Sequence, residues 1–257
     1  MSAPKVLFGF HAVGVRLKTA PASILELYVD PSRRDARMRQ FVERAKEAGL
    51  RLLDADGMRL AKLCGSHGHQ GVVARVQAID QARSLDDLLD QLETAGQVPL
   101  LLVLDGVTDP HNLGACLRTA DAAGALAVIV PKDKSATLTP TVRKVACGAA
   151  EVIPLVAVTN LARTLEKLQQ RGLWVVGTAG EAEVSIYDQD LTGPTILIMG
   201  AEGKGMRRLT REHCDYLVNL PMAGSVSSLN VSVATGVCLF EAQRQRGAKK
   251  AVASRKS

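Results

Sequence analysis

Pro99-Leu100-Leu101-Leu102-Val103-Leu104 is a run of six residues without a polar side chain. A strand with one face in water alternates apolar and polar residues, so this run predicts a strand that is buried on both faces. Similar runs occur at 127–130, 174–177 and 195–199, with helical patterns between them at 115–123 and 161–171. Buried strands that alternate with helices predict an α/β fold with a mostly parallel sheet, covered by helices on both sides.

The chain before this region has the pattern of a smaller α/β module. Strand patterns at 24–29, 50–53 and 71–76 alternate with helical patterns at 33–46 and 58–64. A polar stretch follows, and Ser84 is a good N-cap for an amphipathic helix that begins at Leu85. We therefore expect a small domain at 1–76, a linker at 77–84, a larger domain at 85–247 and a disordered basic tail at 248–257.

The net charge of +6 is concentrated at the two ends of the chain. Residues 1–80 carry 13 Lys and Arg against 8 Asp and Glu, and residues 241–257 carry 6 against 1. Such a distribution is typical of a protein that binds nucleic acid. A solvated basic surface with a disordered tail is the alternative. Because only 3% of the residues are aromatic, phosphate contacts rather than base stacking should dominate any nucleic-acid binding.

Several classes of protein are excluded by composition. No apolar run approaches the roughly 20 residues that span a bilayer, and the N-terminus lacks a signal-peptide pattern, so we expect a cytoplasmic protein. The five cysteines are odd in number and widely spaced, with no Cys-x-x-Cys pair and no nearby His at ligand spacing. We expect reduced, mostly buried thiols and no metal site. These cysteines are Cys64, Cys116, Cys147, Cys214 and Cys238.

Ligands bind at the carboxyl ends of parallel strands, where this sequence has three unusual loops. In the loop at 105–114, Asn112 precedes Arg118 by six residues, and a helix that starts near Leu113 would hold both at the same end of the strand. The alternatives are a helix N-cap for Asn112 and a surface ion pair with Asp121 for Arg118.

The second loop, at 200–206, is rich in glycine. It lacks the spacing and the Ser or Thr of a P-loop, and it comes too late in the chain for a Rossmann turn. Its acidic residue, Glu202, would repel a pyrophosphate but could pair with a cation such as Arg118.

The third loop, at 220–234, combines Pro221, Gly224 and three serines before a nearly continuous apolar segment. It predicts a binding loop that leads into a buried helix. The alternative is a core helix whose first amides are capped by Ser228 and Asn230.

Together the three loops carry a family resemblance. Asn112-x-Gly-x-x-x-Arg118-Thr-Ala, Ile-Met199-Gly-Ala-Glu202-Gly-x-Gly and Leu220-Pro-Met-x-Gly-x-x-x-Ser-Leu-Asn-Val-Ser-Val-Ala resemble, in order, the three motifs of the SpoU (TrmH) class of SPOUT RNA 2′-O-ribose methyltransferases. Residues 9–13 and 69–72 resemble the ribosomal-protein-like RNA-binding domain of one branch of that family. That branch methylates a guanosine in the peptidyl-transferase region of 23S rRNA.

The resemblance implies a trefoil-knotted catalytic domain that forms a homodimer and binds S-adenosylmethionine in the knot. By motif position, the residues expected to hold the cofactor are Met199, Gly200, Leu220, Pro221, Met222 and Leu229. The expected catalytic and ribose-handling residues are Asn112, Arg118, Glu202, Ser228 and Asn230. Candidate RNA contacts in the small domain are Arg33, Arg34 and Arg37, whereas His11 and His69 either contact RNA or pack inside the domain.

The resemblance also assigns roles that can be tested. Arg118 acts either as the base for the ribose hydroxyl, helped by a neighbouring phosphate or carbonyl, or as a charged group that stabilises the developing alkoxide, since a guanidinium ordinarily keeps its proton. Glu202 would orient Arg118, Asn112 and Ser228 would position the substrate, and Asn230 would fix the loop. Two rival functions remain at this point, namely methylation of tRNA and a non-catalytic role as an RNA-binding ribosome-assembly factor.

Overall fold

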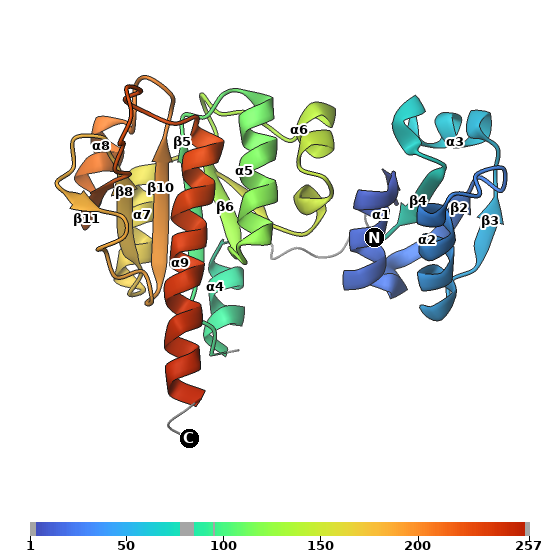
Figure 1. Cartoon of the computed structure of the whole chain (residues 1–257), viewed down its shortest axis with the longest axis horizontal. Coiled ribbons are helices and arrows are strands. Elements are labelled where there is room, and N and C mark those ends of the chain that lie inside the picture. The colour runs from blue at the N-terminus through green and yellow to red at the C-terminus, as the bar shows by residue number, and fades with distance from the viewer. Residues whose placement is uncertain (1–3, 78–84, 95, 255–257) are drawn as a thin grey trace. The chain divides into compact units, whose positions relative to one another are not determined.

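The computed structural model describes residues 4–77, 85–94 and 96–254 (Figure 1). The chain divides into two compact units, residues 1–81 with 147–152 and residues 82–146 with 153–257. Ser84 and most of the expected linker lie outside the described residues. Among the helices in the described part, none is long and apolar enough to cross a membrane.

The first unit is a mixed four-stranded sheet in the order β1-β4-β2-β3. The expected strands and helices at 24–29, 33–46, 50–53, 58–64 and 71–76 are present with small shifts at their ends. Its elements are β1 (Lys5–Phe8), α1 (Phe10–Thr19), η1 (Pro21–Ser23), β2 (Ile24–Val29), α2 (Ala36–Glu47), β3 (Leu52–Asp54), α3 (Gly57–Cys64), η2 (His67–His69) and β4 (Val72–Val76).

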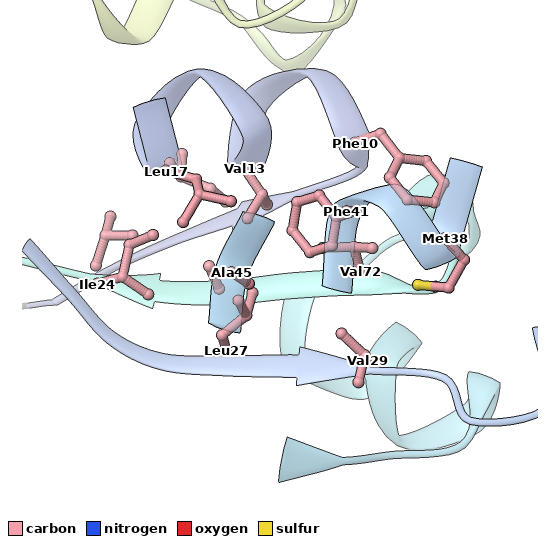
Figure 2. Packing of buried hydrophobic residues seen from close by; sticks show 13 residues of the cluster. Phe10, Val13, Leu17, Ile24, Leu27, Val29, Met38, Phe41, Ala45 and Val72 are labelled. Carbon is pink, nitrogen blue, oxygen red and sulfur yellow. The ribbon is translucent and has the colours of Figure 1, made fainter. Parts of the chain in front are cut away.

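The core of this unit forms between α1, α2 and the sheet (Figure 2). Phe10 and Val13 on α1 meet Phe41 on α2, and the Phe10 and Phe41 rings contact edge to face at 5.6 Å. Asp35 starts α2 by accepting a hydrogen bond from the amide of Met38. This packing fixes the ends of α1 and α2 that carry the candidate RNA-binding residues.

The second unit contains a seven-stranded sheet in the order β7-β6-β5-β10-β8-β11-β9, in which every pair of neighbours is parallel. The predicted parallel α/β sheet is thus confirmed. The strands are β5 (Leu100–Asp105), β6 (Ala127–Pro131), β7 (Leu155–Val158), β8 (Trp174–Thr178), β9 (Val184–Ser185), β10 (Thr195–Gly200) and β11 (Tyr216–Asn219). All six residues of β5 are buried, as its apolar sequence predicts.

Helices cover both faces of this sheet. On one face, Leu89 of α4 (Leu85–Thr94) and Leu165 of α7 (Leu161–Gln170) pack on apolar residues of β5, β6, β8 and β10. On the other face, α5 (Pro110–Ala122) lies beside α9 (Val231–Ser254), as Figure 1 shows with α9 in red. Two short helices, α6 (Pro140–Val145) and α8 (Arg208–Glu212), also belong to this unit, whereas the 3₁₀ helix η3 (Ala149–Glu151) belongs to the first unit.

Two expectations about helix ends are wrong. Helix α5 starts at Pro110 rather than near Leu113, because the carboxylate of Asp109 accepts the hydrogen bond of the His111 amide at 3.0 Å and caps the helix there. Helix α9 runs on to Ser254, through residues expected to be disordered. Alanine and lysine dominate that segment, and both are strong helix formers that extend a helix already fixed by packing.

Candidate active site

The loop after β10 folds into a small hairpin that presents Glu202. Ala201 and Gly205 exchange two backbone hydrogen bonds of 3.1 and 2.8 Å, and Gly203 and Gly205 both have positive φ values. At Gly200 a Cβ atom would lie 2.3 Å from the carbonyl carbon of Gly205. Only glycine therefore allows the hairpin to close so tightly onto the end of β10.

The carboxylate of Glu202 joins the three loops of the sheet edge. Its Oε1 atom accepts hydrogen bonds from Nδ2 of Asn230 at 2.6 Å, from the amide of Val231 at 3.2 Å and from Nδ2 of Asn112 at 3.4 Å. Asn230 Nδ2 also donates to Oδ1 of Asn112 at 3.0 Å. Residues separated by up to 118 positions thus form one hydrogen-bonded group at the carboxyl ends of the strands.

Asn230 has two functions in this arrangement. Its Oδ1 atom accepts hydrogen bonds from the amide of Ser232 at 2.9 Å and from the Ser232 hydroxyl at 2.6 Å, so it caps the first turn of α9. Its Nδ2 atom points to Glu202 and Asn112. The capping alternative and the site are therefore both present at Asn230, whereas Asn112 lies inside α5 and is not its N-cap.

A cavity of about 490 Å³ opens beside this group, which is within the usual range for a site that binds a small ligand. Of the expected cofactor residues, all but Pro221 line it, and the catalytic candidates Glu202 and Ser228 do so too. The lining residues among the candidates are Met199, Gly200, Leu220, Met222, Leu229, Glu202 and Ser228. Candidates from the second and third loops thus surround one cavity, and Asn112 and Asn230 do not line it but bind Glu202, which does.

The cavity is also lined by a segment that was not expected from the sequence. Thr178, Gly180 and Glu181 in the loop after β8 line it, together with Lys204 and Arg211. The signal was available, because the run at 174–177 is itself a predicted parallel strand and its carboxyl end must lie at the same edge of the sheet. Glu181 pairs with Arg211, and a bond from its own backbone amide together with this guanidinium lowers the pKa of its carboxyl.

Arg118 lies elsewhere on the same helix as Asn112. Both belong to α5, where six residues correspond to a rise of roughly 9 Å, so the two do not sit at the same level of the sheet edge. The Arg118 side chain is exposed and does not line the cavity. Asn112 therefore reaches the group around Glu202, whereas the role of Arg118 stays a prediction from the motif.

The residues around the cavity fit S-adenosylmethionine. Met199, Leu220 and Met222 supply apolar surface for an adenine ring, and the Glu202 carboxylate can face the positive charge of a sulfonium. Throughout the described segments, no group of three His, Cys, Asp or Glu side chains has a spacing that could hold a metal ion.

In the first unit, three of the four RNA-binding candidates gather around Phe10. The guanidinium carbons of Arg33 and Arg37 lie 4.8 and 4.7 Å from the centre of its ring, and Arg37 Nη2 is 3.2 Å from His11 Nε2. Arg33 also donates to the carbonyl of Gln70 at 2.6 Å. Arg34 is exposed nearby in the chain. These contacts hold two long side chains in fixed positions.

His69 is the histidine that packs inside this unit. It is buried, and its Nδ1 atom accepts a hydrogen bond from the amide of Gly71 at 3.0 Å. His11, in contrast, is exposed on the first turn of α1. Of the two histidines left open by the sequence, only His11 therefore remains a candidate for RNA contact.

Comparison with known proteins gives two family matches and close relatives. The model of the SpoU rRNA methylase family matches residues 99–240, and that of the RNA 2′-O ribose methyltransferase substrate-binding domain matches residues 6–82. The 23S rRNA (guanosine-2′-O-)-methyltransferase RlmB of Pseudomonas syringae pv. tomato is 69% identical over 254 residues, 97% of this chain and 99% of that protein. The protein of the same name from Ralstonia nicotianae is 62% identical over 96% of this chain and 98% of its own length.

A solved structure agrees with these matches. The SpoU methyltransferase AviRb from Streptomyces viridochromogenes, in complex with the cofactor AdoMet, is similar with a TM-score of 0.71 and 26% identity. The similarity covers 96% of this chain and 92% of that chain, which includes both units. With its two domains, its parallel sheet and its three motif loops joined by hydrogen bonds at Glu202, the chain belongs to the SpoU rRNA methylase family.

Proposed function

We propose that this protein methylates the ribose 2′-hydroxyl of a guanosine in 23S rRNA, in the peptidyl-transferase region, with S-adenosylmethionine as the methyl donor. The observation that carries the proposal is the convergence of Asn112 and Asn230 on Glu202, whose carboxylate lines the cavity. The curated relatives at 69% and 62% identity, which are named for this activity on 23S rRNA, support the choice of substrate.

The residues of the chain would work mainly by positioning. S-adenosylmethionine supplies an electrophilic methyl group when it is bound. The loops at Met199, Leu220 and Leu229 would hold it against the sheet edge, and Ser228 also lines the cavity. Glu202 fixes the side-chain amides of Asn112 and Asn230, which would present a rigid polar group to the ribose beside the cavity. Correct placement of two reactants can supply much of the acceleration of such a transfer.

Arg118 would act on the hydroxyl proton or on the charge that develops as the proton leaves. If it is the base, replacement of Arg118 by Lys shifts the ascending limb of the pH-rate profile, on which the rate rises as the base loses its proton. If it stays charged and stabilises the alkoxide, the rate falls while the limb keeps its position. The two forms of the mechanism are separated by measuring kcat against pH for both proteins.

We further propose that the protein is a homodimer through its knotted catalytic unit. Helix α9 supports this, because Val233 and Phe240 are 52% and 48% exposed and lie seven residues apart on one face of the helix. A second copy would cover such an apolar stripe. Replacement of Phe240 by Glu should then give a monomer in light scattering, and an unchanged mass would count against this interface.

For the RNA, Arg33, Arg34, Arg37 and His11 are proposed contacts of the first unit. The fixed positions of Arg33 and Arg37 around Phe10 suit phosphate binding, because less side-chain freedom is lost when RNA binds. Replacement of Arg37 by Gln should lower RNA affinity and reduce the slope of log K against log salt by about one unit. An unchanged slope would remove Arg37 from the interface.

The substrate is tested by mapping 2′-O-methyl groups on total RNA before and after deletion of the gene. We expect one guanosine of 23S rRNA to lose its methyl group and to regain it when the gene is returned. Loss of a tRNA methyl group instead would assign the protein to tRNA modification. No change in any RNA would favour a non-catalytic role.

A further inference from the structure

The last residue of β5, Asp105, is a buried carboxylate next to the candidate active site. It is 1% exposed, and both of its oxygens bind the same residue. Oδ1 accepts from Nε of Arg207 at 2.6 Å, and Oδ2 accepts from the amide of Arg207 at 2.8 Å. A buried carboxylate is costly unless it is paired and hydrogen-bonded, and here one residue satisfies both requirements.

These bonds close the segment that carries Glu202. The segment leaves β10 at Gly200, which is paired with Asp105 in the sheet register, and it returns at Arg207, which binds the Asp105 side chain. Both ends of residues 200–207 are therefore fixed to one residue of β5. Inside the segment, the bonds between Ala201 and Gly205 form the hairpin described above.

Asp105 is also the start of the loop that carries Asn112. The next residue, Gly106, has a φ of 84°, and a Cβ atom there would lie 3.6 Å from Cβ of Ala201. The loop that leads to Asn112 and the hairpin that presents Glu202 thus diverge from the same point. The hydrogen bond of 3.4 Å between Asn112 and Glu202 depends on how that point holds the two loops.

We infer that Asp105, through Arg207, is a positioning residue that sets the place of Glu202 relative to Asn112 and Asn230. This inference rests on the proposed function only for its effect on the rate. An aspartate suits the role because its two oxygens face two donors of Arg207. The isosteric asparagine would turn an amide nitrogen toward one of those donors and lose that bond.

The test compares Asp105→Asn and Arg207→Gln with a matched control. The control is Arg208→Gln, which removes an exposed ion pair of 2.5 Å between Arg208 and Glu212. Both of these residues belong to α8, the helix that begins directly after Arg207. For Asp105→Asn we expect a fall in kcat of about 100-fold, because small displacements of catalytic groups have effects of that size. Arg207→Gln, which keeps the backbone bond to Asp105, should lose less, and Arg208→Gln should behave as wild type.

Two readouts distinguish positioning from a general effect on folding. In a Glu202→Gln background, Asp105→Asn should change kcat by no more than about threefold, because the group that it positions is already lost. In Asp105→Asn, hydrogen exchange should accelerate at the Gly205 amide, which donates a hydrogen bond to the carbonyl of Ala201, while the amides of β5 and β10 stay protected. If Asp105→Asn fails to fold, Arg207→Gln undergoes the same two measurements.

The outcomes separate this inference from the proposed function. Effects of Asp105→Asn and Glu202→Gln that multiply, or exchange at Gly205 that is unchanged, would overturn the positioning role. A wild-type protein that transfers no methyl group to 23S rRNA would overturn the proposed function, while the exchange measurement would still decide whether Asp105 holds the hairpin.

Discussion

Arg246 binds helix α9 to the amino ends of strands in the large sheet, opposite the carboxyl ends where the cavity lies. Its guanidinium donates to four backbone carbonyls: Nε to Leu191 at 3.0 Å, Nη1 to Val98 at 3.0 Å, and Nη2 to Pro99 at 3.0 Å and Gly193 at 2.6 Å. These carbonyls belong to the segments that enter β5 and β10. Burial lowers the pKa of this guanidinium.

The loss expected for Arg246→Ala follows from these four bonds. A hydrogen bond contributes about 1 kcal/mol net, so four bonds give about 4 kcal/mol if none is replaced by water. The side chain is only partly buried, so water will satisfy some of the carbonyls. We therefore expect the free energy of unfolding to fall by about 2 to 4 kcal/mol. Lysine, with a single ammonium group, cannot reach all four carbonyls and should recover less than half of the loss.

The fluorescence of Trp174 is a suitable signal, because it is the only tryptophan in the chain and its amide binds the carbonyl of Pro194 beside the Arg246 contacts. Equilibrium unfolding in urea, followed at this residue, gives the stability of the second unit. Lys249→Ala is the control, because Lys249 lies on the same helix as Arg246 and donates one exposed hydrogen bond of 3.2 Å to the Thr192 hydroxyl. Its loss should lower the free energy of unfolding by less than about 0.5 kcal/mol. A loss below about 1 kcal/mol for Arg246→Ala would refute the reasoning.

Three further predictions follow from single residues. Gly200→Ala should weaken binding of S-adenosylhomocysteine more than about tenfold in calorimetry, because its Cβ would clash with backbone at 2.3 Å, whereas Gly236→Ala, with 3.6 Å to its nearest neighbour, should not. The hydrogen bond from Arg244 lowers the pKa of the buried Glu241 below 4.5, so the stability that this carboxylate contributes is present above pH 4.5 and is lost as the pH falls. Urea unfolding of Glu241→Gln should accordingly differ from wild type at pH 7 and converge with it in acid; a constant difference would contradict this. Burial raises the pKa of the Cys238 thiol to about 12, so iodoacetamide should modify it at pH 8 only after denaturation, which mass spectrometry can follow.

The parts of the fold that could be predicted are those with a clear local pattern of apolar residues. The first five residues of β5 are all apolar, and the sheet indeed buries the strand on both sides. Helix α1 was not predicted, although Phe10, Val13 and Leu17 have helical spacing, because Gly14 is a poor helix former in the middle of the segment. β7 was missed because it is a short strand at the edge of the sheet, where three of its four residues are half-buried and Ala157 is exposed.

The candidate site likewise has one part that was predicted from the sequence and one part that was not. Motif order was enough to expect that Asn112, Glu202 and Asn230 belong together, and the structure brings them within hydrogen-bonding distance. The hydrogen-bonded pair of Asp105 and Arg207 could not be predicted, because the two residues are 102 positions apart and no local sequence pattern links them. The knot itself and the dimer stay predictions from the family.

Methyl transfer can be measured by incubating purified protein with labelled S-adenosylmethionine and unmethylated 23S rRNA, then locating the label by nuclease protection and mass spectrometry. We expect one methyl group on the 2′-oxygen of one guanosine in the peptidyl-transferase region. We also expect Asn230→Ala, which removes the bonds to Glu202 and Asn112, to lower the rate by about 100-fold. Label on a base, label on tRNA alone, or a wild-type rate in the Asn230 variant would contradict the proposed methyl transfer and the positioning by Asn230.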